Sequence, residues 1–125
     1  MQIKHVINAP ARLIWNILID THQWPVWGPS ISAVQSPQQY ITAGLKGRIQ
    51  TIIGVWLPFE ITDFEPMSLW NWKVAGIPAT GHRVTILDED RCELSFEMPF
   101  VALPYGLVCL QAARKIDRIA QGHKE

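Results

Sequence analysis

Hydrophobic and polar positions change their period along the chain, and each change marks a different predicted element. Residues 3–7 alternate weakly and predict a short first strand. Residues 13–19 have helical spacing, and Pro10 suits the first turn of that helix because its missing N–H costs nothing there. Residues 23–29 contain too much proline and glycine for a long helix, which predicts a short helical turn followed by a loop.

From residue 31 onward the pattern becomes that of β-strands, in which alternate side chains face the same side. A turn is predicted at residues 43–47, an interruption at residues 76–78, and a solvated hairpin turn at the three acids of residues 88–90. The strands themselves are predicted over residues 31–35, 48–55, 57–65, 70–74, 82–86 and 92–98.

A helical period returns after Pro104, with Leu107, Val108, Leu110, Ala112, Ile116 and Ile119 on the apolar side and Gly122 ending the pattern. Short connections favour a meander whose apolar face the last helix covers. We therefore predict an α+β fold with two short helices after the first strand. Its curved antiparallel sheet of about six to seven strands wraps around the long C-terminal helix, in one domain over residues 1–125.

Composition narrows the classes of function. The chain has 125 residues, 48% of them hydrophobic, and a formal net charge of zero, which excludes intrinsic disorder and disfavours a nucleic-acid partner. No apolar run approaches the roughly 20 residues that span a bilayer. The first five residues lack the apolar stretch of a signal peptide. We expect a cytoplasmic protein without an integral membrane segment.

Cysteines and histidines carry no spacing typical of a metal or redox site. Cys92 and Cys109 lack a CxxC arrangement, so we predict two reduced, buried side chains. The four histidines are scattered, and no phosphate-binding, dinucleotide-binding or nucleophile-elbow motif occurs. The sequence therefore predicts neither a metal site nor a cofactor.

Several segments, in this order and spacing, resemble the START-like helix-grip superfamily, in particular its polyketide cyclase/dehydrase-like branch (SRPBCC). They are Ile7-Asn8-Ala9-Pro10 followed by Trp15 and Asp20; Trp24-Pro25-Val26-Trp27-Gly28-Pro29; and Phe64-Glu65-Pro66 leading into Leu69-Trp70-Asn71-Trp72, Gly76 and His82. The resemblance covers essentially the whole chain and implies the helix-grip fold. It also implies binding of lipids, sterols, polyketides or other hydrophobic small molecules, with cyclase or dehydratase activity in a minority of members.

The inward face of the predicted sheet is almost entirely apolar, and it faces a natural ligand space between sheet and helix. The same alternation places Ile53 and Ile86 inward. Sequence leaves open whether this face packs solidly or encloses a pocket. The candidate ligand-binding residues are Trp27, Thr51, Phe59, Trp70, Trp72, His82, Val84, Phe96 and Met98.

His82 is the one ionisable side chain among these candidates. Burial among apolar neighbours should leave its imidazole neutral. Two roles stay open: a structural histidine bonded to a backbone carbonyl or a Trp N–H, and a general acid/base or ligand anchor.

The tryptophans have alternatives of the same kind. Trp70 and Trp72 either fill the core or stack on a flat ligand. Trp24 and Trp27 either form the rim or lid of a pocket or pack against the sheet, and Trp56 is predicted to be an exposed aromatic at a hairpin end.

We predict that the chain binds a hydrophobic small molecule that is aromatic, polyketide-like or lipid-like, and that it is more of a binding protein than an enzyme. One alternative is a cyclase or dehydratase in which His82 moves a proton. A further alternative is an accessory module with a filled core that binds a protein partner, or a second copy of itself, through exposed tryptophans.

Overall fold

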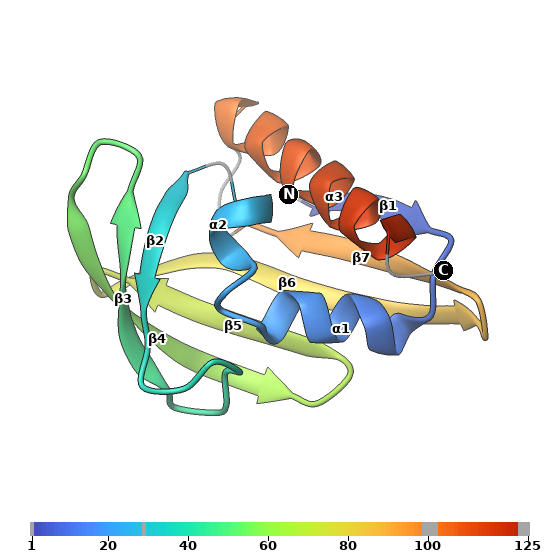
Figure 1. The fold of residues 1–125 in the computed structure, drawn as a ribbon, viewed down its shortest axis with the longest axis horizontal. Helices are drawn as coiled ribbons and strands as arrows, with labels where there is room; N and C mark the ends of the chain where they lie inside the picture. Colours follow the sequence, from blue (N-terminus) through green and yellow to red (C-terminus); the bar gives the residue numbers. More distant parts are fainter. Residues whose placement is uncertain (1, 29, 99–102, 123–125) are drawn as a thin grey trace.

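A curved antiparallel sheet forms one layer of the molecule, and the helices lie on its concave face (Figure 1). This computed structural model describes residues 2–28, 30–98 and 103–122, with side chains of the last helix from Leu110 onward. In these residues seven strands pair in the order β1-β7-β6-β5-β4-β3-β2. The predicted α+β architecture is therefore confirmed.

The elements follow the predicted order along the chain. They are β1 (Gln2–Ile7), α1 (Ala11–Ile19), α2 (Trp24–Trp27), β2 (Ile31–Gln35), β3 (Lys46–Thr51), β4 (Trp56–Glu65), β5 (Leu69–Val74), β6 (Ile77–Asp88), β7 (Arg91–Glu97) and α3 (Leu103–Gly122).

Two predicted strand boundaries are wrong. The strand predicted over residues 48–55 ends at Thr51, because the chain turns over residues 52–55, where Gly54 adopts a φ of 88°. The predicted inward residue Ile53 is consequently 82% exposed. The predicted interruption at residues 76–78 is also misplaced, since β6 begins at Ile77 and tolerates Pro78 near its start.

The inward position predicted for Ile86 is wrong for a different reason. Ile86 has the correct parity but is 63% exposed. The β6–β7 hairpin extends past the part of the sheet that the helices cover, so none of the described helices lies over this end of the strand (Figure 1).

The curvature of the sheet is concentrated beside Trp72. The register between β4 and β5 shifts between Ile61 and Asp63, and the register between β5 and β6 shifts between Asn71 and Lys73. Trp72 therefore lies between two β-bulges, one in each neighbouring strand, and bulges bend and twist a sheet locally.

The described part of α3 packs close to β1, α1 and α2. Its buried face consists of Ala112, Ala113, Ile116 and Ala120, whose mostly small side chains allow a close approach. The predicted inward residues Leu107 and Val108 lie outside the described side chains. Among the described residues, no helix is both long enough and apolar enough to cross a membrane.

Candidate functional site

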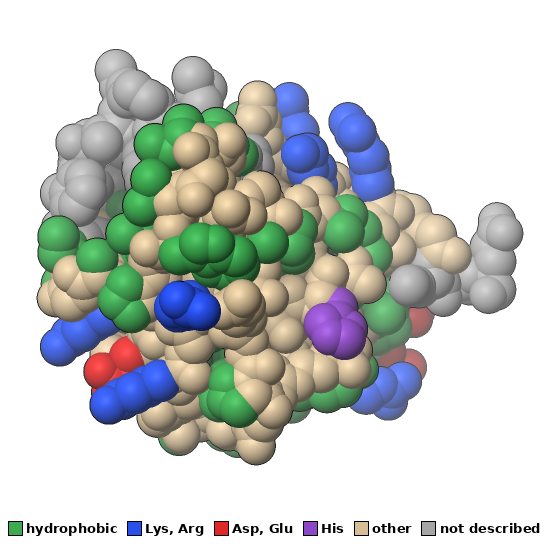
Figure 2. All heavy atoms as spheres, turned by 60° about the vertical axis from the view of Figure 1, so that its left-hand side comes forward, with side chains coloured by type: hydrophobic (Ala, Val, Ile, Leu, Met, Phe, Trp, Pro, Cys, Tyr) green, Lys and Arg blue, Asp and Glu red, His purple; other side chains and the backbone are tan. Residues whose placement is uncertain are grey.

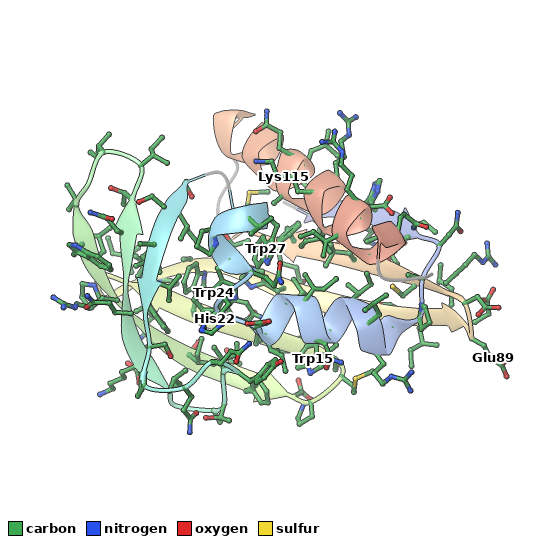
Figure 3. All side chains as sticks on the ribbon, in the orientation of Figure 1. Trp15, His22, Trp24, Trp27, Glu89 and Lys115 are labelled. Carbon is green, nitrogen blue, oxygen red and sulfur yellow. The ribbon has the colours of Figure 1, made fainter. Side chains whose placement is uncertain are left out.

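An aromatic cluster fills the centre of the space between the sheet and the helices. Trp70, from β5, stacks on Trp24 of α2 with ring centroids 5.4 Å apart and on His82 of β6 with centroids 3.8 Å apart. Trp27 and Phe96 approach the His82 ring edge-on at 6.0 and 5.5 Å. Trp24 and Trp27 point from α2 toward the sheet (Figure 3), so both pack in the core and neither forms a lid.

His82 is buried and neutral in this cluster. Its Nδ1 lies 3.3 Å from the backbone oxygen of Trp70, which can only accept, so Nδ1 carries the proton and Nε2 is an acceptor. Burial lowers the pKa of His82 to about 3, and the bond to Trp70 offsets only part of that effect. This arrangement matches the structural role, in which the ring is held by a backbone carbonyl.

Three buried indole groups near His82 have no hydrogen-bond partner in the part of the chain that the structure describes. Trp24 donates from Nε1 to the backbone oxygen of Leu18 at 2.9 Å. Among the described residues, by contrast, the Nε1 atoms of Trp27, Trp70 and Trp72 are buried without an acceptor. An unpaired buried donor costs roughly 1–3 kcal/mol. A ligand atom that accepts a hydrogen bond from one of these three Nε1 groups would therefore recover this cost.

An open apolar pocket of about 460 Å³ lies at the end of the sheet where β3 turns into β4 and β5 turns into β6. We name it the hairpin-end pocket. Its lining comes from β2 to β6 and the β3–β4 turn, with Thr51 and Ser30 as the polar residues. The lining residues are Ser30, Ile31, Ile49, Thr51, Ile52, Ile53, Val55, Leu57, Trp72, Val74 and Ala79.

The structure separates the predicted candidates into three places. Thr51 and Trp72 line the hairpin-end pocket, and Met98 and Trp72 line a second hollow beside Asn71 and Arg83, although Trp72 and Met98 are also buried members of the core. The other candidates belong to the packed core; they are Trp27, Phe59, Trp70, His82, Val84 and Phe96.

Several lining residues were not among the predicted candidates, notably Ile31, Leu57, Val74 and Ala79. They share one property: each lies at the hairpin end of its strand or close to it. Strand alternation reports the face on which a side chain lies, but it does not report where along the strand the packed layer stops. The lining residues could have been found from the sequence only by aligning the predicted strand ends of the meander with one another.

The second hollow depends on a glycine. Gly81 lies opposite Asn71 on β5, and a Cβ on Gly81 would come within 2.5 Å of Asn71 Oδ1. Asn71 donates to Asp63 at 3.0 Å, and Arg83 pairs with Glu97 at 3.2 Å. These polar groups satisfy one another, as is typical of a solvated sheet face.

The exposed aromatic predicted at a hairpin end is only partly exposed. Trp56 begins β4, and the guanidinium carbon of Arg48 lies 5.5 Å from the centroid of its ring. Among the described residues, no three His, Cys, Asp or Glu side chains lie close enough together to hold a metal ion.

Comparisons with known proteins show similarity in structure alone. No protein-family model and no curated protein sequence matches the chain. Among solved structures, protein MLL2253 of Mesorhizobium loti has a TM-score of 0.74 at 14% identity, over 100% of this chain and 98% of the other. The chain has the START-like helix-grip fold.

Other helix-grip structures that match are enzymes by name. The ZhuI aromatase/cyclase of Streptomyces sp. R1128 has a TM-score of 0.69 at 14% identity, over 97% of this chain and 92% of the enzyme. Norcoclaurine synthase of Thalictrum flavum, solved with dopamine and hydroxybenzaldehyde, has a TM-score of 0.65 at 11% identity. That match covers 100% of this chain and 87% of the synthase.

Proposed function

We propose that the protein binds an apolar small molecule, aromatic or lipid-like, in the hairpin-end pocket. One observation carries the proposal: a cavity of about 460 Å³ whose lining is almost wholly aliphatic or aromatic. That volume lies within the range of about 300–1,000 Å³ that is typical of ligand pockets. Each ~100 Å² of apolar ligand surface that leaves water in this pocket contributes roughly 2.5 kcal/mol to binding.

Two residues that line the pocket carry donor groups that we propose for orienting such a ligand. The Thr51 hydroxyl accepts from the backbone N–H of Val55 at 3.3 Å and keeps its own proton to donate. Trp72 lines the pocket and has no acceptor for Nε1 among the described residues. We propose that these groups donate to a carbonyl, ether or phenolic oxygen on an otherwise apolar molecule.

The named helix-grip neighbours support an aromatic ligand. The norcoclaurine synthase structure contains two small aromatic molecules, and ZhuI is named as an aromatase/cyclase. Because their sequence identity to this chain is low, these proteins support the class of ligand but not a particular reaction. A lipid-like ligand fits the same aliphatic lining.

Catalysis by His82 is the less favoured function. Its imidazole is enclosed by Trp70, Trp27, Trp72 and Phe96, and it is not among the residues that line the hairpin-end pocket. With a pKa of about 3, a general base is far from the range near 7 in which proton transfer is most effective. We therefore propose binding without a proton transfer by His82.

The test fills the pocket with a larger side chain. Val74 lines the pocket, so Val74→Phe should occupy part of the ligand's space, whereas Val6→Phe adds the same group to an exposed site on β1. Calorimetric titration with 2-naphthol and with decanoic acid measures both candidate classes. We expect binding of at least one probe and about tenfold or greater weakening in Val74→Phe, with Val6→Phe unchanged.

The result that contradicts the proposal is equally clear. If neither probe binds the wild-type protein, or if Val74→Phe binds as tightly as Val6→Phe, the hairpin-end pocket is not the ligand site. Thermal unfolding of both variants serves as the control for folding.

A further inference from the structure

The mouth of the hairpin-end pocket exposes large aliphatic side chains to solvent. Ile52 is 70% exposed, Ile53 82% and Val55 47%, all in the β3–β4 turn. Ile77 begins β6 at the same end of the sheet and is 63% exposed. We name these four residues the apolar rim. Large aliphatic side chains exposed together at one end of a molecule mark an interaction site more often than a solvated turn does.

Basic side chains outnumber acidic ones around the apolar rim, where Glu60 of β4 is the acid in register with Lys73 and with Lys46. Residues 21–59 and residues 66–87 contain no Asp or Glu, and together they supply β2, β3, β5 and most of β6. Arg48, which contacts the Trp56 ring, and Lys73, three residues before Gly76 in the β5–β6 turn, are the cations closest in sequence to the two turns. Glu97, at the end of β7, forms an ion pair with Arg83 and accepts a hydrogen bond from Gln2.

The acidic side chains gather at the opposite end of the sheet. Asp88, Glu89 and Asp90 form the β6–β7 turn, and Figure 3 shows Glu89 at the far side of the molecule from the β3–β4 hairpin. In Figure 2, which turns the β3–β4 end toward the viewer, green apolar side chains and blue Lys and Arg side chains dominate over red acids. The net charge of zero therefore conceals a molecule with one apolar, weakly basic end and one acidic end.

We propose that the apolar rim inserts shallowly into an anionic lipid bilayer, with the pocket mouth facing the membrane. The four aliphatic side chains enter the boundary between headgroups and acyl chains, where binding grows with buried apolar area. Trp56 and the two cations lie at headgroup level, the position that tryptophan prefers and in which Lys and Arg meet anionic lipid. The acidic β6–β7 turn is repelled from the same surface, which sets the orientation.

A lipid surface fits these features better than a second copy of the chain. Two copies joined at this end would bring Arg48 and Lys73 of both together, and the one Glu60 in register with Lys73 on each copy leaves both ends with the same net sign. The proposal is independent of whether the hairpin-end pocket holds a ligand, because the rim contacts lipid through its own exposed side chains.

The experiment compares two pairs of exposed aliphatic residues by vesicle sedimentation. The vesicles contain phosphatidylcholine alone or phosphatidylcholine with phosphatidylglycerol at three to one. Ile52→Ser with Ile53→Ser removes the tip of the apolar rim, and Ile86→Ser with Leu87→Ser removes an exposed pair beside the acidic turn. All four side chains are exposed, so both double variants should keep the wild-type thermal unfolding temperature.

We expect the wild-type protein to sediment with the anionic vesicles and to partition less onto phosphatidylcholine alone. The Ile52/Ile53 variant should partition at least tenfold less than wild type, and the Ile86/Leu87 variant should match wild type. Lys73→Gln should reduce partition onto anionic vesicles several-fold and weaken its dependence on salt, whereas Lys4→Gln, on β1 at the other edge of the sheet, should not.

Three outcomes overturn the proposal. The first is a wild-type protein that sediments with neither vesicle, and the second is equal loss in the two double variants. The third is a wild-type protein that does not bind vesicles but self-associates in analytical ultracentrifugation, with the Ile52/Ile53 changes abolishing the self-association. That result would make the apolar rim an interface between copies of the chain. None of these outcomes depends on binding of 2-naphthol or decanoic acid, so a failure here is distinguishable from a failure of the proposed function.

Discussion

The burial of neutral His82 should make the protein lose stability as the pH falls. In the unfolded chain a histidine titrates at its usual pKa of 6.5, whereas in the folded protein the pKa of His82 is about 3. Between these values the unfolded state binds a proton that the folded state does not. The contribution of His82 to stability is therefore complete above about pH 6.5 and declines as the pH falls toward 3.

The magnitude follows from the size of the pKa difference. The free energy of unfolding should fall by about 1.4 kcal/mol for each pH unit below 6.5, which amounts to about 2 kcal/mol between pH 7 and pH 5. The groups packed on the His82 ring are Trp27, Trp70, Trp72 and Phe96, none of which titrates in this range. The lowered pKa values of Asp88 and Glu97 lie below this window, so their carboxylates stay ionised.

Urea unfolding at pH 7, 6 and 5 measures this dependence in the wild type and in His82→Phe. The phenyl ring can stack on Trp70 but cannot titrate, so the variant should lack the one-proton slope, although losing the bond to the Trp70 oxygen lowers its stability at pH 7. His22→Gln, at an exposed position, should keep the wild-type slope. Equal slopes in wild type and His82→Phe would refute the reasoning, because they would mean that His82 accepts a proton in the folded protein.

Two further predictions concern individual contacts. Gly47→Ala should destabilise the protein by about 1–3 kcal/mol, measured by urea unfolding, because a Cβ would lie 2.5 Å from the Gln35 backbone oxygen and 2.8 Å from the Phe59 ring. Gly122→Ala is the control, because a Cβ at Gly122 meets nothing within 4 Å. If the Gly47→Ala variant is as stable as the Gly122→Ala variant, the close packing around Gly47 is contradicted. The Cys92 thiol should resist iodoacetamide in the native protein and react with it in urea, because burial raises the pKa of the thiol to about 11. Peptide mass spectrometry detects the modification. Rapid labelling of the native protein would disprove the burial of Cys92.

Local alternation predicted most strands and the inward face of the sheet because side-chain direction in a strand depends only on neighbouring residues. It placed Trp70, Trp72, His82 and Phe96 on the inner face, where the structure has them. The same rule failed for Ile53 and Ile86, since having the inward parity does not ensure that another layer covers the residue. The bulges beside Trp72 were equally invisible, because a register shift is a relation between two strands.

The sequence by itself determined the fold class, the order of the elements and the neutrality of the interior. Tertiary structure decided that the aromatic residues pack on one another around His82, and that the open apolar space lies at the hairpin end, beyond that cluster. It also decided that the charges separate into a basic, apolar end and an acidic end, which a net charge of zero does not reveal. The physical reason is that periodicity records the face to which each side chain points, whereas a cavity or a surface patch depends on where separate strands end relative to one another.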